Sequence, residues 1–200
     1  MSKVNLDKIA DESSIRDIRP GDVERVHEIF TWYVNNTAVT FMHKAPSLEE
    51  YREHVAAIRH QYPFLVAEHE GKVVGFAYAN GFGRGEAYNW SAELTIYIDP
   101  ELRHAGLGRK LYDALEVILK DMGLLNLYAC VGIPAEIEDE YLNYNSSQFH
   151  EHMGFKTVGT FDRCGYKFNH FYSMIWMEKV IGEHRDGHAP ERKGPPHHHV

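Results

Sequence analysis

The middle of the chain holds three strand-like runs in succession, with no helical pattern between them. Residues 64–69 and 72–79 are rich in β-branched and aromatic residues and flank a tight turn at Glu70-Gly71, which predicts a β-hairpin. Residues 87–98 form a third and longer run. A doubly wound fold would alternate strands and helices throughout, so this succession excludes it. The chain is therefore predicted to build a mixed α/β fold, with helices on both faces of one sheet.

Helical and strand patterns flank these three runs. Apolar residues recur with a 3.6-residue period over residues 23–34, and Ser47 and Glu50 have the spacing of a capping box that opens a second helix. The strand at 87–98 leads through a glycine-containing loop into a helix that crosses to a strand at 125–131, which predicts that these two strands are parallel. The further predicted elements are strands at 14–19, 157–161 and 171–180 and helices at 106–122 and 141–152.

The two ends of the chain differ in composition from its middle. Residues 1–13 are polar and lack an apolar period, and residues 182–200 are rich in Gly, Pro, His and charge. Segments that bury so little apolar surface stay disordered. We therefore predict a flexible segment at 1–13, a single domain at 14–181 and a disordered tail at 182–200. The histidines at 197–199 are predicted to be part of this solvated tail rather than a metal site, and no other metal site is predicted.

The charge balance is acidic, with 21 Lys and Arg residues against 29 Asp and Glu residues and a formal net charge of −8. Nucleic-acid and anionic-membrane binders need a basic face, so neither partner is expected. No apolar run approaches the roughly 18 residues of a membrane span, and the first residues lack the apolar stretch of a secretory signal. The two cysteines, Cys130 and Cys164, fit a reducing compartment. These features predict a soluble, cytoplasmic protein.

A glycine-containing loop, Arg103-His-Ala-Gly-Leu-Gly108, joins the strand at 87–98 to the next helix. Its glycines let the backbone approach a ligand closely, and the free N–H groups of the first helical turn converge on one point. Arg103, Arg109 and Lys110 add positive charge, which predicts a diphosphate site. The third glycine of a dinucleotide fingerprint is missing, as is the pattern of a P-loop. Taken alone, the loop is more simply interpreted as the start of an ordinary helix.

The surroundings of this loop change that interpretation. The strand Glu93-Leu-Thr-Ile-Tyr-Ile98 followed by R-x-x-G-x-G resembles the coenzyme A loop of the GNAT superfamily of N-acetyltransferases. More closely, the segments Tyr88–Ile98 and Asn143–Phe155 are similar to two motifs of the phosphinothricin acetyltransferase family, and Gly159-Thr160 and Gly165-Tyr-Lys167 match its ending. The resemblance spans residues 15–179. It implies a GNAT-like, largely antiparallel sheet, acetyl-CoA (coenzyme A) as the cofactor, and a homodimer.

The resemblance also assigns residues to the cofactor. It implies that the pantetheine arm pairs with the backbone of Ile96, Tyr97 and Ile98, whose N–H groups polarise the acetyl carbonyl. Asn143 and Ser146, predicted on one stripe of the helix at 141–152, are expected to bond the pantetheine amides or the phosphates. The pyrophosphate is expected on the loop and the helix start, at Arg103, His104, Ala105, Gly106, Leu107, Gly108 and Arg109.

Glu93 and His150 are the candidate catalytic residues. A carboxylate that opens a long apolar strand must be solvated or paired. Glu93 is therefore either part of a buried ion pair with an arginine or a general base with a raised pKa, and the resemblance favours the base, because acyl transfer requires a neutral amine. His150 lies where many GNAT members place a tyrosine that protonates the departing thiolate. It is either this acid or a hydrogen-bonded structural residue. Direct transfer in a ternary complex is predicted, since neither cysteine has the setting of a nucleophile.

The acceptor side departs from the family pattern. Residues 135–142 are inserted before the helix motif, Gly85 stands where the family often has an arginine, and Phe171-Tyr-Ser173 replaces a W-x-D motif. The relatives acetylate the α-amine of small amino-acid-like molecules such as phosphinothricin, methionine sulfoximine and methionine sulfone, and such an acceptor is expected here. The candidate pocket residues are Trp32, Phe41, Arg84, Tyr88 and Trp90.

Two alternative functions stay open. The first is a protein or peptide N-acetyltransferase on the same scaffold, for which an acidic groove is suitable. The second is a non-catalytic acyl-CoA-binding module, and the presence of Glu93 counts against it.

Overall fold

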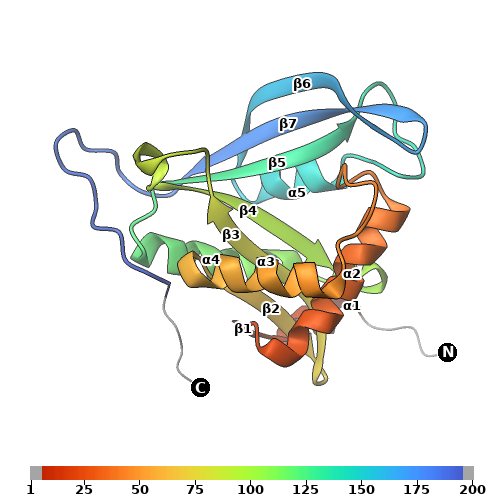
Figure 1. Ribbon diagram of the computed structural model, residues 1–200, viewed down its shortest axis with the longest axis horizontal. Helices are drawn as coiled ribbons and strands as arrows, with labels where there is room; N and C mark the ends of the chain where they lie inside the picture. Colours follow the sequence, from red (N-terminus) through yellow and green to blue (C-terminus); the bar gives the residue numbers. More distant parts are fainter. Residues whose placement is uncertain (1–5, 196–200) are drawn as a thin grey trace.

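A seven-stranded sheet in the order β1-β2-β3-β4-β5-β7-β6 runs through the computed structural model, which describes residues 6–195 (Figure 1). Every neighbouring pair of strands is antiparallel except β4 and β5, which are parallel. The predicted mixed, largely antiparallel sheet and its parallel pair are confirmed. The strands are β1 (Ser14–Asp17), β2 (Phe64–His69), β3 (Lys72–Gly81), β4 (Ser91–Ile98), β5 (Asn126–Pro134), β6 (Lys156–Lys167) and β7 (His170–Val180).

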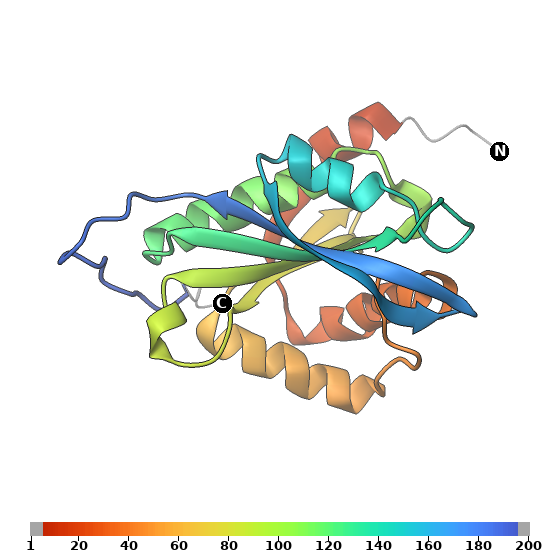
Figure 2. The ribbon, with the colours of Figure 1, turned by 90° about the horizontal axis from the view of Figure 1, so that it is seen from above.

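Helices cover both faces of this sheet, with α2 and α3 on one face and α4 and α5 on the other (Figure 2). The predicted capping box of α3 forms, because Ser47 Oγ accepts a hydrogen bond from the Glu50 N–H and the Glu50 carboxylate accepts one from the Ser47 N–H. No helix among residues 6–195 is both long and apolar enough to cross a membrane. The helices are α1 (Leu6–Glu12), α2 (Val23–Asn36), α3 (Leu48–Gln61), α4 (Leu107–Asp121) and α5 (Asn145–His152), with short 3-10 turns at Pro20–Asp22, Glu86–Tyr88 and Pro100–Leu102.

The parallel strands β4 and β5 are paired over three residues only. Ser91 to Glu93 of β4 lie opposite Asn126 to Tyr128 of β5, and beyond this point the two strands diverge (Figure 1). On its other edge β4 stays paired with β3 as far as Ile98. One edge of β4 after Glu93 therefore has no paired strand among the described residues, and a gap opens through the sheet beside it.

Several element boundaries differ from the sequence prediction, three of them by about four residues or more. The long strand begins at Ser91 rather than at residue 87, because Glu86–Tyr88 form a 3-10 turn. Helix α5 begins at Asn145 rather than at residue 141, because the Asp139 carboxylate accepts the N–H groups of the preceding loop. Strand β6 continues to Lys167, across an irregular stretch after Phe161 whose composition is typical of a turn.

Both ends of the described chain make contacts with the domain that the sequence does not indicate. Residues 6–12 of the segment expected to be flexible form α1, where Ile9 is buried and the Lys110 ammonium donates to the Ala10 and Ser13 carbonyls. The tail expected to be disordered returns to the domain, where the Trp90 indole donates to the Pro190 carbonyl at 2.8 Å. The histidines at 197–199 lie outside the described residues.

Candidate active site

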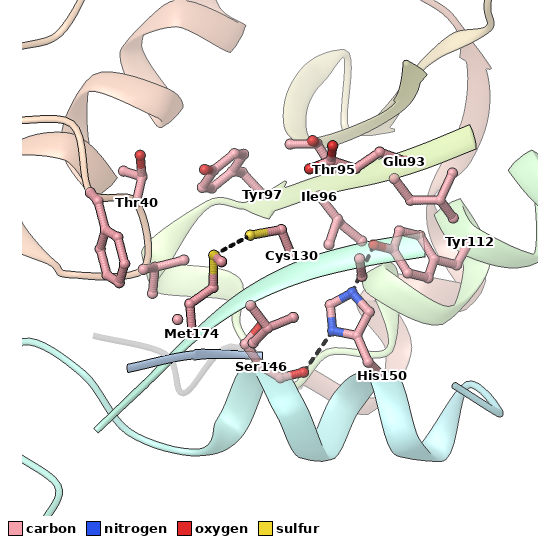
Figure 3. Close-up of a pocket in the computed structure, with 16 residues that line it drawn as sticks. Thr40, Glu93, Thr95, Ile96, Tyr97, Tyr112, Cys130, Ser146, His150 and Met174 are labelled. Carbon is pink, nitrogen blue, oxygen red and sulfur yellow. Dashed lines mark hydrogen bonds between the residues drawn. The ribbon is translucent and has the colours of Figure 1, made fainter. Parts of the chain in front are cut away.

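Two connected cavities lie at the gap between β4 and β5. The inner cavity, of about 280 Å³, passes between the strands and is lined from both faces of the sheet (Figure 3). The outer groove, of about 510 Å³, follows the end of β4, the glycine-containing loop and the starts of α4 and α5. The two cavities share four lining residues, which are Val39, Ile96, Tyr97 and Ser146. The outer groove and the inner cavity therefore adjoin each other at these residues.

The outer groove collects every residue that the resemblance assigned to the cofactor. These residues are Ile96, Tyr97, Ile98, Arg103, His104, Ala105, Gly106, Leu107, Gly108, Arg109, Asn143 and Ser146. Gly106 caps α4 with a left-handed backbone (φ 81°) that glycine adopts without strain. A Cβ on Gly108 would lie 3.0 Å from the Phe149 ring, so this glycine also lets α4 and α5 approach each other. Asn143 precedes α5, so it does not share the predicted helical stripe with Ser146.

Arg103 is a cation of the groove with two buried nitrogen atoms that lack an acceptor among the described residues. Its guanidinium carbon lies 5.1 Å from the ring centroids of both Trp32 and Tyr33, and within residues 6–195 its buried Nε and Nη2 atoms have no acceptor. Buried donors without acceptors are costly, so this arrangement favours an anionic ligand. Lys110 departs from the prediction, because its ammonium holds the end of α1 instead of facing the groove. Trp32 packs on Arg103 and does not line the inner cavity.

The unpaired edge of β4 presents backbone groups to the gap. The Asp99 N–H donates to the Val74 carbonyl at 2.8 Å, and in an antiparallel ladder the residues alternate between facing the partner strand and facing away. Ile96 and Ile98 therefore turn their backbone groups toward the gap, whereas those of Tyr97 face β3. The Ile98 carbonyl accepts a hydrogen bond from the Tyr33 hydroxyl at 2.7 Å, which agrees with this alternation.

Glu93 lies in the inner cavity at the point where β4 and β5 separate (Figure 3). Its side chain is half-buried, and this burial raises the pKa of the carboxyl group above its usual value. No Arg or Lys among the described residues forms an ion pair with it, in contrast to the ion-pair alternative. Glu93 is thus a carboxylate with a weakened preference for its charged form, which suits a proton acceptor.

His150 has both ring nitrogens engaged. Nδ1 lies 2.7 Å from the Ser146 carbonyl and Nε2 lies 2.9 Å from the Tyr112 hydroxyl (Figure 3). The ring is buried, which lowers its pKa to about 4 and keeps it neutral near pH 7. A carbonyl requires Nδ1 to donate, so Nε2 accepts the proton of Tyr112. This geometry favours the structural alternative for His150. The contact also adds Tyr112 to the residues of the site. The sequence did not indicate Tyr112, because it lies on the apolar stripe of α4.

Of the five candidate acceptor residues, Phe41 lines the inner cavity and the other four do not. Arg84, Tyr88 and Trp90 lie on the segment between β3 and β4, outside both cavities, and Trp90 instead binds the C-terminal tail. The sequence could not show this, because the path of that segment depends on contacts with distant residues. The inner cavity is lined instead by Thr40, Thr95, Cys130 and Met174, among others. Of these four residues, Thr95 is the one that the sequence could have indicated, because it lies two residues after Glu93 and shares its face of the strand.

Cys130 lies in the inner cavity but has the character of an inert thiol. Its sulfur lies 2.8 Å from the Met174 sulfur, and its pKa is raised to about 12, mainly by burial and also by Glu93. A thiol acts as a nucleophile through its thiolate, which is scarce at such a pKa. Residues 6–195 contain no group of three or more His, Cys, Asp and Glu side chains placed to hold a metal ion. The cavity therefore offers a carboxylate as its reactive group.

Comparisons with known proteins agree with this geometry. The family described as "Acetyltransferase (GNAT) domain" matches residues 15–176. The phosphinothricin N-acetyltransferase of Streptomyces viridochromogenes is 30% identical over 165 residues, which cover 82% of this chain and 86% of that protein. The L-methionine sulfoximine/L-methionine sulfone acetyltransferase of Salmonella typhimurium is 28% identical over 123 residues, covering 62% and 67% of the two chains.

A solved structure shows the same fold over nearly the whole chain. The phosphinothricin acetyltransferase of Sinorhizobium meliloti in complex with AcCoA has a TM-score of 0.79 and 27% identity, and the match covers 91% of this chain and 94% of that one. The expectation drawn from the strand, loop and helix motifs is confirmed. The chain belongs to the GNAT superfamily of acetyl-CoA-dependent N-acetyltransferases, in the group similar to phosphinothricin acetyltransferases.

Proposed function

We propose that the protein transfers the acetyl group of acetyl-CoA to the amine of a small amino-acid-like acceptor, by direct attack within a ternary complex. One observation carries this proposal: the outer groove opens into the inner cavity beside the unpaired edge of β4, where Glu93 lies. A donor in the groove and an acceptor at Glu93 would meet in the gap. Relatives named for phosphinothricin and for methionine sulfoximine and sulfone support the acceptor class.

The groove has the donors that acetyl-CoA requires. The free N–H groups at the start of α4 and the unpartnered Arg103 guanidinium suit its phosphates. The gap-facing backbone of Ile96 and Ile98 suits the amides of its pantetheine arm, and Asn143 and Ser146 lie on the opposite wall of the groove. When bound, acetyl-CoA supplies an acetyl group activated as a thioester. The backbone N–H groups of β4 that face the gap would polarise its carbonyl.

Glu93 would take the proton that the acceptor amine must lose. An ammonium group has no free electron pair, so the attacking amine has to be neutral. Burial raises the pKa of Glu93, which brings its basicity closer to that of the amine and makes the proton transfer less uphill. His150 would hold the Tyr112 hydroxyl against the cavity wall, as a structural residue rather than as the acid.

The size of the inner cavity favours a small acceptor over a peptide. Its volume of about 280 Å³ is at the lower end of ligand pockets, and Phe41, Val131 and Met174 form part of its wall. The homodimer implied by the resemblance and a cytoplasmic location belong to this proposal as well.

The test is thiol release from acetyl-CoA with phosphinothricin, methionine sulfoximine, methionine sulfone and short peptides as acceptors. We expect release with at least one of the amino-acid analogues. Glu93→Gln is expected to lower turnover by about 10²–10⁴-fold, since a general base contributes that much. The calorimetric affinity for acetyl-CoA should stay unchanged, and the melting temperature should not fall, because the substitution removes a half-buried charge that has no ion-pair partner among the described residues.

Glu86→Gln is the matched control, because Glu86 is an exposed carboxylate outside both cavities and its loss should leave turnover intact. Thiol release with peptides alone would favour the protein N-acetyltransferase alternative. Full turnover of Glu93→Gln would remove Glu93 from the mechanism. If titration with acetyl-CoA gave no heat, the outer groove would not be the donor site.

A further inference from the structure

Lys167 is a buried lysine whose ammonium group donates to three backbone carbonyls. The residue is 2% exposed, and Nζ lies 2.7 Å from the Val34 oxygen and 2.8 Å from the oxygens of Thr37 and Thr40. An ammonium group has three N–H donors, and here each donor has its own acceptor. The Val34 carbonyl belongs to the last turn of α2, where carbonyls lack helical partners. Lys167 thus joins the end of α2 to the segment that follows it.

This arrangement requires the charged form of the lysine. A neutral amine has two N–H groups, so it would leave one of the three carbonyls without a donor. Burial lowers the pKa of Lys167 to about 8, whereas the negative end of the α2 dipole favours a cation at this place. A buried cation that is fully hydrogen-bonded is a fixed point of the structure, because any movement of the carbonyls would leave a donor or an acceptor unpaired.

The residues that Lys167 holds also form a wall of the inner cavity. The segment 37–41 follows α2, and its residues Val39, Thr40 and Phe41 line that cavity. Thr40 and Phe41 do not line the outer groove. The two sides of the site therefore differ: the donor groove is formed mainly by β4, α4 and α5, whereas part of the acceptor wall depends on a segment without regular structure.

The end of β6 contacts this segment a second time. The Phe41 ring lies directly against Gly165, where a Cβ atom would overlap the ring. Lys167 comes two residues later and is followed by the two-residue turn Phe168-Asn169, whose positive φ angles of 49° and 63° fit a tight hairpin. Gly165 thus leaves room for the Phe41 ring, and Lys167 supplies a cation to the backbone carbonyls of the same segment.

We propose that Lys167 is a positioning residue for the acceptor, which fixes the wall formed by residues 37–41 through its three carbonyl contacts. The segment reaches the outer groove only at Val39, so the phosphate end of that groove, at residues 103–109, stays unaffected. The inference rests on the proposed function, because it takes the inner cavity as the acceptor site. A misplacement of about 1 Å in such a wall costs as much as 100-fold in rate. Loss of the ammonium should therefore weaken the use of the acceptor and leave the binding of acetyl-CoA intact.

The test uses Lys167→Met, which keeps a long side chain and removes the donors. Hydrogen–deuterium exchange of residues 37–42 should become faster than in the wild type, while exchange at the start of α4 should not change. The KM for the acceptor is expected to rise about tenfold or more, and the Kd for acetyl-CoA is expected to stay the same. A merely structural lysine would lower the melting temperature without this split between acceptor and donor.

Two further variants make the outcome decisive. Lys179→Met is the control, because Lys179 pairs with Glu116 away from both cavities and should leave the acceptor KM unchanged. Gly165→Ala keeps Lys167 but displaces the Phe41 ring, so it should also raise the acceptor KM. This variant tests the role of the same segment if Lys167→Met does not fold. Unchanged exchange and an unchanged acceptor KM would overturn the inference. If no acceptor is acetylated by the wild type, the proposed function fails, and the exchange experiment still decides whether Lys167 holds the segment.

Discussion

Glu93 is the side chain whose environment sets the behaviour of the whole site. Its carboxyl group is half-buried at the point where two strands separate, and burial raises its pKa above the ordinary 4.5. A base works only when it is deprotonated, so activity must fall as the pH drops through the pKa of the group. In the proposed mechanism, an acid limit of activity therefore follows from this one residue.

We predict that kcat/KM falls on the acid side with a midpoint above pH 4.5, because protonated Glu93 cannot accept the amine proton. The measurement is the pH dependence of kcat/KM for the wild type and for Glu93→Gln. The variant should turn over slowly, and its kcat/KM should not show this fall at acid pH. Glu86→Gln should keep the wild-type profile. An acid limb that persists in Glu93→Gln would assign the titration to another group.

Most residues of the outer groove could be predicted from the sequence because they are close together in the chain. Residues 96–109 run without a break through a strand, a loop and a helix start, so local geometry alone brings them into one groove. Arg84 and Trp90 lie outside both cavities, because their positions depend on the path of a long connection. The contact of Lys167 with Val34 spans 133 residues, and no local pattern indicates such a pairing.

At the scale of elements, the start of α4 is the part of the fold most sensitive to its sequence. Gly106 has a φ of 81°, and a Cβ there would lie 3.2 Å from the Ala10 Cβ of α1. A β-branched residue in this conformation is strained by about 1–2 kcal/mol. The loop and the first turn of α4 must shift to relieve that strain, and both form the donor groove.

Gly106→Val is therefore predicted to weaken acetyl-CoA binding by roughly five- to thirtyfold, the equivalent of that strain, as measured by calorimetry. Gly85→Val is the matched control, since Gly85 also has a positive φ (101°) but lies outside both cavities, and its affinity for acetyl-CoA should stay normal. Normal affinity in Gly106→Val would place the phosphates elsewhere.

The order of the elements was predictable, but their lengths were less so. The three strand-like runs and the glycine-containing loop have strong local signals, and they fix the sheet and its parallel pair. Strand β6 was predicted too short, because the residues at 162–165 have the composition of a turn and yet pairing with β7 resumes at Gly165. Helix α1 has little apolar surface of its own and depends on Lys110 of α4, a contact that spans 100 residues.

At the scale of the whole molecule, the C-terminal segment after β7 ties distant parts of the domain together. The Pro190 carbonyl accepts the Trp90 indole proton, the Lys193 N–H and the Arg192 guanidinium donate to the Met122 carbonyl, and Gly123 lies against Glu191. This segment looked disordered in the sequence because it is polar. Its order comes from hydrogen bonds to the domain, which composition does not reveal.

Removal of residues 182–200 is predicted to lower the melting temperature by about 2–6 °C, because a few hydrogen bonds of roughly 0.5–1.5 kcal/mol each are lost. Turnover at 25 °C should stay near that of the wild type, since the segment lines neither cavity. Removal of residues 196–200 alone keeps these contacts and is the control for thermal unfolding. An unchanged melting temperature in the longer truncation would show that the segment adds no stability.

The divergence of β4 and β5 has a consequence for how this protein can change over time. The outer groove and the inner cavity meet at the gap, and apart from the four residues that they share, their walls come largely from different parts of the chain. Under the proposed function, substitutions at residues 40 and 41 would alter which amine is accepted without changing the residues that bind the nucleotide part of acetyl-CoA. The outer groove would stay constant while residues 40 and 41 of the inner cavity vary, so a new acceptor selectivity would require changes in only a short stretch of sequence.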